Sequence, residues 1–238
     1  MMTRIVRKTL SLSAAVIGIA LLTILPVAAG DTVLTVNTTS DSTSWFISGE
    51  ASLVMNGFDL NALGIARPAV IDKVSISVDS PTPGVPVEMV IYEDANGGSP
   101  SDATLAGRRQ VDITASGVFT VTLDTPITIN QPAVWIGFYL PVDFSFFADT
   151  SGSSVLTYWA WTPGGTFDLN NLSSAAVIGP ADGSAPVSLN MNGKARITAE
   201  ITGAVGSTAG ATTAGAITQT AGASGVDLNV LATYPLCE

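Results

Sequence analysis

The chain has 238 residues, of which 9 are Lys or Arg, 19 are Asp or Glu and none is His, so its net charge is −10. The absence of His excludes Ser-His-Asp and Cys-His catalysis and His-ligated zinc. With Cys237 as its single Cys, the chain cannot form an intramolecular disulfide. The acidic balance argues against nucleic acid as a partner, because phosphate binding needs a basic face.

Residues 1–30 have the pattern of a secretory signal peptide. Three basic residues among the first eight precede an apolar run over residues 10–25, Pro26 ends that run, and small residues follow. The alternative is an uncleaved membrane anchor, for which residues 10–29 are just long enough. Both interpretations predict export, so we expect a secreted or cell-surface, extracellular protein. Cleavage after residue 30 would leave a net charge of −13.

Between residues 31 and 203, apolar and polar residues alternate repeatedly with a period of two. The alternation covers residues 74–78, 87–91, 119–123 and 195–201, and each stretch predicts a strand with one buried face. Residues 133–140 are apolar on both faces, which predicts a central strand with Trp135 in the core. Turns rich in Gly, Pro and Asn separate these stretches. The sequence therefore predicts an all-β protein, an antiparallel β-sandwich of the jelly-roll-like kind.

The composition changes after Gly203. Residues 204–225 are almost entirely Gly, Ala, Ser and Thr, which predicts a flexible linker. A strand-like pattern resumes at residues 226–230, so residues 226–238 are interpreted as the stub of a second domain or as a tail that docks on the sandwich. The predicted organisation is a signal peptide (1–30), a β-sandwich domain (31–203), a linker (204–225) and this stub or tail (226–238). The role of Cys237 stays open.

Residues 87–100 read VEMVIYEDANGGSP. This segment resembles the IYEDxNGGxP-type strand and loop of accessory β-sandwich domains in secreted bacterial multidomain proteins. Further stretches match the pattern of that family in the same order, at residues 105–111, 117–127, 133–139, 147–151 and 195–201. Ser101 departs from it, since the family often has Gly there. The resemblance spans roughly residues 65–203 and implies a non-catalytic, jelly-roll-like module for binding or display, without a shared ligand.

The loop over residues 93–102 is rich in side-chain oxygens. Asp94, Asn96 and Asp102 begin like a calcium loop, and calcium prefers six to eight oxygen ligands. Calcium is the cofactor that such a loop would take, although no bidentate Glu stands at the twelfth position. The alternative is a connection whose shape comes from Gly97 and Gly98, with Asp side chains accepting backbone hydrogen bonds. Asp149, before Ser151, has the same alternative interpretation.

Tyr158, Trp159 and Trp161 form the densest aromatic cluster. On a strand, Trp159 and Trp161 share one face and Tyr158 takes the other. Two neighbouring indole rings would suit stacking on sugars, so the three residues are candidate glycan-binding residues. The alternative is that the Trp face is simply buried in the core.

Catalysis has little support in the sequence. Glu88 and Glu200 lie at polar positions of alternating strands, where solvated charges are expected, and no Gly-x-Ser-x-Gly motif occurs. We predict no enzyme, but an exported module that binds a glycan or another surface polymer or is displayed at the cell surface, with a polysaccharide or cell-surface polymer as partner. The rival is a structural subunit of a surface layer or filament that associates with itself through edge strands. A divergent hydrolase is a remote third alternative.

Overall fold

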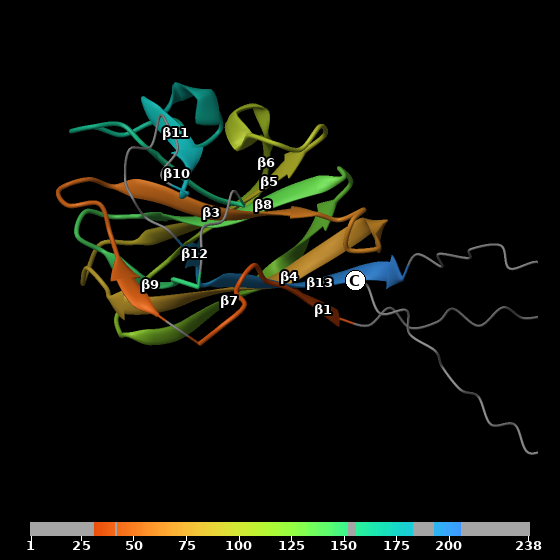
Figure 1. Cartoon of the computed structure of the whole chain (residues 1–238), viewed down its shortest axis with the longest axis horizontal. Coiled ribbons are helices and arrows are strands. Elements are labelled where there is room, and N and C mark those ends of the chain that lie inside the picture. The colour runs from red at the N-terminus through yellow and green to blue at the C-terminus, as the bar shows by residue number, and fades with distance from the viewer. Residues whose placement is uncertain (1–30, 41, 152–155, 183–192, 206–238) are drawn as a thin grey trace, which may run out of the picture. The chain divides into compact units, whose positions relative to one another are not determined.

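The computed structural model describes residues 31–40, 42–151, 156–182 and 193–205. These residues fold into two antiparallel sheets packed face to face, with two short 3-10 turns, η1 (Pro100–Asp102) and η2 (Leu172–Ser174) (Figure 1). The prediction of an all-β antiparallel sandwich is confirmed. No helix of the described ranges has the length and hydropathy needed to cross a membrane.

One sheet has seven strands. Its path runs β1-β13-β4-β9-β12, while β7 pairs with β4 and β2 pairs with β9. The long strand β4 therefore lies between β7 on one side and β13 and β9 on the other. The strands of this sheet are β1 (Asp31–Leu34), β2 (Thr43–Trp45), β4 (Ile65–Ser80), β7 (Gly117–Ile129), β9 (Ser145–Asp149), β12 (Lys194–Ala195) and β13 (Ile197–Val205).

The other sheet has six strands in the order β11-β10-β3-β8-β5-β6. Its strands are β3 (Ser52–Asp59), β5 (Val87–Asp94), β6 (Thr104–Val111), β8 (Ala133–Leu140), β10 (Thr157–Trp161) and β11 (Val177–Pro180). The predicted central strand is β8, which pairs with β3 and β5 and is buried on both faces. The four alternating stretches also form strands as predicted, in β4, β5, β7 and β12–β13.

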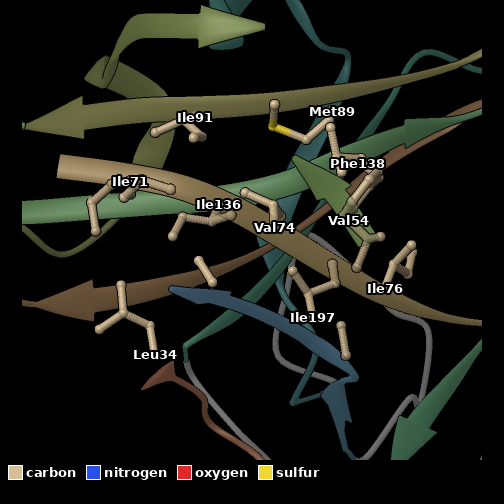
Figure 2. Packing of buried hydrophobic residues seen from close by; sticks show 14 of the residues in the cluster. Leu34, Val54, Ile71, Val74, Ile76, Met89, Ile91, Ile136, Phe138 and Ile197 are labelled. Carbon is tan, nitrogen blue, oxygen red and sulfur yellow. The ribbon is translucent and has the colours of Figure 1, made fainter. Parts of the chain in front are cut away.

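The inter-sheet core consists of the apolar side chains that face inward from both sheets. Figure 2 shows part of it, with Val74 and Ile76 of β4 and Ile197 of β13 in the same cluster as Ile136 and Phe138 of β8. All five side chains are fully buried. Val74, Ile76 and Ile197 stand at apolar positions of alternating stretches, so the period of two places them in the core, whereas Ile136 and Phe138 belong to the run that is buried on both faces.

A second apolar layer, the outer cluster, covers the opposite face of the six-stranded sheet. It contains inner-strand residues such as Met55, Val90 and Trp135, together with Leu169 and Leu172 from the connection after β10. Figure 1 shows this connection and the one after β5 above the sheet. The Tyr92 hydroxyl donates to the carbonyl of Leu169 at 2.9 Å, which fastens the longer connection to β5. Both faces of β3, β8 and β5 are thus buried, which explains their apolar runs.

The outer face of the seven-stranded sheet is polar. Thr120, Ser75 and Thr198 form one row across β7, β4 and β13, and their side chains are exposed or half-exposed. The Ser75 and Thr120 hydroxyl oxygens lie 2.9 Å apart. In the next row, Lys73 and Glu200 form an ion pair at 2.5 Å, and this contact raises the pKa of Lys73.

Asp149 fastens the segment between β1 and β2. Its side chain is fully buried, and its carboxylate accepts the backbone N–H groups of Thr38, Thr39 and Ser151 at 2.7, 3.2 and 2.9 Å. Burial by itself raises the pKa of Asp149, but hydrogen bonds from Ser151, Thr38 and Thr39 outweigh it and hold that pKa well below its usual range. The interpretation of Asp149 as a turn-stabilising carboxylate is confirmed.

The predicted domain boundaries fall mostly on residues outside the described ranges. The signal peptide and the C-terminal residues 226–238 are among these, as is Cys237. Of the predicted linker, Ala204 and Val205 are described, and they are the last two residues of β13. The chain divides at residue 206 into two units, and every described residue belongs to the first.

Candidate functional site

A pocket of about 570 Å³ opens on the outer side of the six-stranded sheet. It lies where β3 ends and β8 begins, beside the connection that follows β5. Its volume is within the usual range of small-molecule sites. The lining residues are Gly57, Phe58, Asp59, Asn61, Asn96, Gly97, Gly98, Ser99, Pro132, Ala133, Trp135, Leu156 and Tyr158. We refer to this pocket as the loop pocket.

Two aromatic side chains form the floor of the loop pocket. Trp135 of β8 and Tyr158 of β10 meet edge to face, with ring centroids 4.9 Å apart and an interplanar angle of 73°. Trp135 is 3% exposed and Tyr158 is half-buried, so Tyr158 is the more accessible of the two rings. Gly57 lies under the indole ring, and a Cβ atom there would come within 2.6 Å of Trp135. Only Gly at this position lets the indole lie flat against β3.

The loop over residues 95–99 forms one wall, and Asp94 holds it in place. One carboxylate oxygen of Asp94 accepts the N–H groups of Asn96 and Gly97 at 3.0 and 2.9 Å. The other oxygen accepts the indole N–H of Trp135 at 3.1 Å. The same buried side chain therefore fixes both the wall and the floor. Gly97 and Gly98 have φ values of +69° and +88°, which other residues rarely adopt.

The hydroxyl of Tyr158 lies close to the wall. Burial raises the pKa of Tyr158 and the charge of Asp182 adds to this effect, while a hydrogen bond with the Ser99 side chain opposes it. The side chain of Ser99 also accepts the N–H of Ser101, at the start of η1. Tyr158 is thus held by the ring contact with Trp135, and its hydroxyl lies beside Ser99.

The charge of the loop pocket is low and negative. Asp59 is the one charged side chain among the thirteen lining residues, and it is exposed. One of its oxygens accepts the N–H groups of Asn61 and Ala62 at 2.9 and 3.1 Å. The pocket offers amide and hydroxyl groups from Asn61, Asn96 and Ser99 instead of basic groups. Such a lining suits a neutral polar ligand and disfavours an anion.

The predicted Trp platform is wrong. Trp159 is fully buried in the inter-sheet core, where its ring lies 5.4 Å from that of Phe146. Trp161 is half-buried and packs against the same core. The alternation was predicted correctly, since Tyr158 points to the opposite face and reaches the loop pocket. The Trp face of β10, however, is the face that meets the other sheet.

The calcium interpretation receives no support from the geometry. Both oxygens of Asp94 accept N–H donors, and the amide of Asn96 donates to the Asp102 carboxylate at 2.9 Å. Asp94, Asn96 and Asp102 do line one small hollow of about 220 Å³ together. Within the described ranges, no group of three or more acidic, His or Cys side chains is arranged to hold a metal ion. The loop has the form of the alternative, a turn shaped by Gly and held by Asp.

The sequence pattern did not predict several of the residues that line the loop pocket. Gly57 stands inside an otherwise apolar strand, and a Gly in a strand interior is a known signal for the close approach of another group. Asp59 is the last residue of β3 and Asn61 lies just after it, and neither carries a local signal, because only the pairing of β3 with β8 brings them near Trp135. Leu156 reaches the pocket for a similar reason, since its carbonyl accepts the N–H of Gly57 at 2.7 Å.

A second, apolar pocket of about 360 Å³ lies at the other end of β8. Val85, Pro86, Tyr139, Pro141 and Val142 are among its lining residues. The Tyr139 ring packs edge to face on Phe167, at 5.6 Å. The Tyr139 hydroxyl is buried and makes no hydrogen bond with any described residue, and burial raises the pKa of this hydroxyl. Its apolar lining makes this pocket a poorer candidate for a polar ligand.

Comparisons with known proteins identify no family. No protein-family model matches the chain, and no curated protein matches it. The solved structures that are similar to it include two of one clostridial protein. The cysteine protease and lectin-like domains of Cwp84, a surface layer associated protein of Clostridium difficile, show 13% identity and a TM-score of 0.44 over 70% of this chain and 37% of that chain. Clostridial Cwp84 after propeptide cleavage shows 15% identity and a TM-score of 0.40 over 70% and 41%. The chain spans less than half the length of either, so the fold class rests on the two sheets described above.

Proposed function

We propose that this protein is an exported, non-catalytic module that binds a neutral sugar in the loop pocket. The observation that carries the proposal is the combination of an aromatic floor with an uncharged polar wall. Sugars present flat C–H faces that stack on aromatic rings and hydroxyl groups that pair with amides and hydroxyls. Tyr158 offers an accessible ring, and Asn96, Ser99 and Asn61 offer the polar groups around it.

The electrostatics of the pocket support a neutral ligand over an acidic one. The lining carries one carboxylate and no basic side chain, while the whole chain carries a net charge of −10. A uronic acid, sulfate or phosphate group would enter against this potential without a cationic partner. Uncharged glycans are therefore the class of ligand to test first.

The pocket chemistry also supports binding without catalysis. Glycoside hydrolysis normally requires two carboxyl groups on either side of the scissile bond. Asp59 is the single carboxylate in the lining, and one of its oxygens is already engaged by two backbone N–H groups. Export is supported by the pattern of residues 1–30, and it would place the pocket outside the cell, at its surface or in the medium.

The experiment is a binding screen followed by one matched pair of variants. The protein is incubated with insoluble neutral and acidic polysaccharides, and soluble fragments of any retained polymer are then titrated by calorimetry. We expect retention on a neutral polymer, and we expect it to persist in a chelator, because the proposed contacts need no metal. Retention confined to acidic polymers, or no retention at all, would overturn the proposal.

Tyr158→Ala is the decisive variant, and Phe46→Ala is its control. Both remove an aromatic ring that reaches solvent, but Phe46, which is 46% exposed, lies outside the loop pocket. Loss of one stacking ring is expected to weaken binding by about 1–3 kcal/mol in Tyr158→Ala, and Phe46→Ala should bind normally. Tyr158→Phe keeps the ring, so retained affinity in that variant would assign the contribution to stacking. Thermal melting of each variant separates lost binding from lost structure.

A further inference from the structure

Strand β7 forms a free edge of the seven-stranded sheet. It pairs with β4 along one side and with no other strand of the described part of the chain. Its first half, residues 117–122, reads GVFTVT and contains no charged residue and no Pro. Val118 is 76% exposed, the highest exposure among the large apolar residues of the described ranges. An uncharged edge strand rich in β-branched residues is a ready template for pairing with another chain.

The backbone N–H and C=O groups of Val118 and Thr120 point away from β4. The N–H of Ser77 in β4 donates to the carbonyl of Arg196, on the side of β4 opposite β7. Because successive residues of a strand direct their backbone groups to opposite sides, Ser75 shares this direction with Ser77. In β7, Thr120 lies opposite Ser75 and Val118 lies opposite Ser77. Because Ser75 and Ser77 direct their N–H and C=O groups away from β7, neither pair exchanges backbone hydrogen bonds. The N–H and C=O groups of Val118 and Thr120 therefore face the free edge.

The second half of β7 is protected, whereas the first half is not. The pairing with β4 jumps from Ile127 to Thr122, so the residues between them form a bulge that contains Asp124 and Pro126. Arg109 of β6 donates to the Thr122 carbonyl at 2.7 Å and pairs with Asp124 at 3.0 Å. Bulges, Pro and charged side chains are the features that block edge pairing. The unprotected part of the edge thus ends at Thr122, and two residues present free outward groups.

We propose that residues 117–122 of β7 are a self-association site, at which two copies of this chain pair antiparallel about a two-fold axis, with Val118 of one copy opposite Thr120 of the second copy. This register satisfies the outward N–H and C=O groups of both residues in both copies, and it stops before the position that Arg109 occupies. It joins two seven-stranded sheets edge to edge. The loop pocket lies on the other sheet, so this site is independent of the proposed sugar binding.

A second copy fits this edge better than an unrelated peptide because the strand is complementary to itself. Two-fold pairing is isologous, so each side contributes the same donors and acceptors in reverse order. It places Val118 beside Thr120, a β-branched cross-strand pair, and it brings no charged residue of residues 117–122 against another. The net charge of −10 on each copy opposes association over a longer range. Salt screens that repulsion, so dimerisation should strengthen as the ionic strength rises.

The test measures the mass of the full chain in solution over a concentration series at low and high salt. Pairing of so few residues buries less than a standard interface of about 1,600 Å², so the dimer is expected at high protein concentration. Sedimentation should show a monomer that becomes a dimer, with at least a tenfold lower dissociation constant at high salt. A chain that stays monomeric to its solubility limit at both salt concentrations would overturn the proposal.

A matched pair of variants locates the contact. Thr120→Lys places a charge at the edge, and Thr198→Lys places the same charge in the same row of the sheet, two strands away on β13. We expect at least a tenfold weaker dimer in Thr120→Lys and an unchanged or modestly weakened dimer in Thr198→Lys. Equal weakening by both would indicate a general charge effect and contradict the edge contact. Thr120→Pro is the second edge variant, since it removes an outward N–H and no hydrogen bond to β4.

Hydrogen exchange of the unmodified protein provides a measurement that needs no variant. The amides of Val118 and Thr120 should exchange several-fold more slowly in concentrated than in dilute samples. Slowing on a different strand would assign the dimer to another surface and overturn this proposal. Slowing at these amides only after an extended foreign peptide is added would identify the edge as a peptide site and contradict self-association.

Discussion

The outer faces of the two sheets differ in composition and in burial, although both belong to one sandwich. The outer face of the six-stranded sheet carries Met55, Val90 and Trp135, and the connections after β5 and β10 cover it. The outer face of the seven-stranded sheet carries rows of Thr and Ser with an ion pair among them, and these side chains reach solvent. The central strand β8 of the covered sheet is apolar on both faces, whereas β4 of the bare sheet alternates between apolar and polar residues, so the pattern of these two strands already distinguishes the covered face from the bare one.

The covered face is also the face that carries a pocket, and the two facts are related. A cover made of loops leaves hollows where it ends, and the loop pocket lies at such a place, between the loop over residues 95–99 and the ends of β3 and β8. The other sheet has a bare polar face, and β7 lies at its edge. One sheet therefore offers a concave site and the other offers an edge.

The largest expected effect comes from Trp135→Ala, which removes the floor of the pocket and a central side chain of the outer cluster. We expect a loss of about 3–5 kcal/mol of unfolding free energy, the usual range for truncating a buried Trp. Thr198→Ala, on the polar face of the other sheet, should change stability by no more than about 0.5 kcal/mol. Urea unfolding measures both. A similar, small loss in the two variants would show that the outer cluster contributes little, and the contrast between the faces would fail.

A smaller and pH-dependent effect is expected at Asp149. Its pKa is lowered in the folded protein, so it stabilises the fold at pH values above its unfolded pKa of about 3.9, and this contribution is lost as the pH falls below that value. Asp149→Asn should cost about 1–3 kcal/mol at pH 7, because the amide keeps a single acceptor oxygen and its NH2 group faces N–H donors that the carboxylate now accepts. The variant should also lose less stability than the unmodified protein between pH 5 and pH 2. Parallel pH curves for the two proteins would contradict this assignment.

The smallest effect sharpens the comparison within the covered face. Tyr139 belongs to the same outer layer as Tyr92, but the Tyr92 hydroxyl has an acceptor, whereas that of Tyr139 has no partner among the described residues. Tyr139→Phe should therefore leave the free energy of unfolding unchanged or raise it by up to about 1 kcal/mol. Thermal melting of the variant measures this change. Tyr92→Phe, its matched control, should lower stability by about 1 kcal/mol. A clear loss in Tyr139→Phe would reveal a hydrogen bond at that hydroxyl.

The sequence predicted the strands well because the signal is local. Each of the four alternating stretches and the apolar run of β8 forms a strand, and Trp135 is buried as expected. The shape of the loop after β5 was also among the stated alternatives, since Asp94, Gly97 and Gly98 determine it through neighbours in the sequence.

The site was predicted less well because it depends on which face is covered. Trp159 and Trp161 share a face, as the alternation requires, but nothing within β10 distinguishes a face that meets another sheet from one that meets solvent. Tyr158 points to the opposite face of β10 from Trp159, so Tyr158 reaches the pocket while Trp159 enters the inter-sheet core. Gly57 and Asp59 enter the site through the pairing of β3 with β8, and such pairing is a property of the fold and not of any short segment.

The pairing of β1 with β13 has a mechanical consequence. Asp31 lies opposite Thr202 in an antiparallel ladder, so the first and the last described strands leave the sandwich at the same end (Figure 1). A pulling force applied through these two ends would separate β1 from β13 one residue pair at a time, because the force acts first on the pair Asp31 and Thr202. Strands pulled from opposite ends would instead share the load across all rungs. This arrangement yields under tension by peeling off β1, and Leu34 is the side chain that this step withdraws from the inter-sheet core.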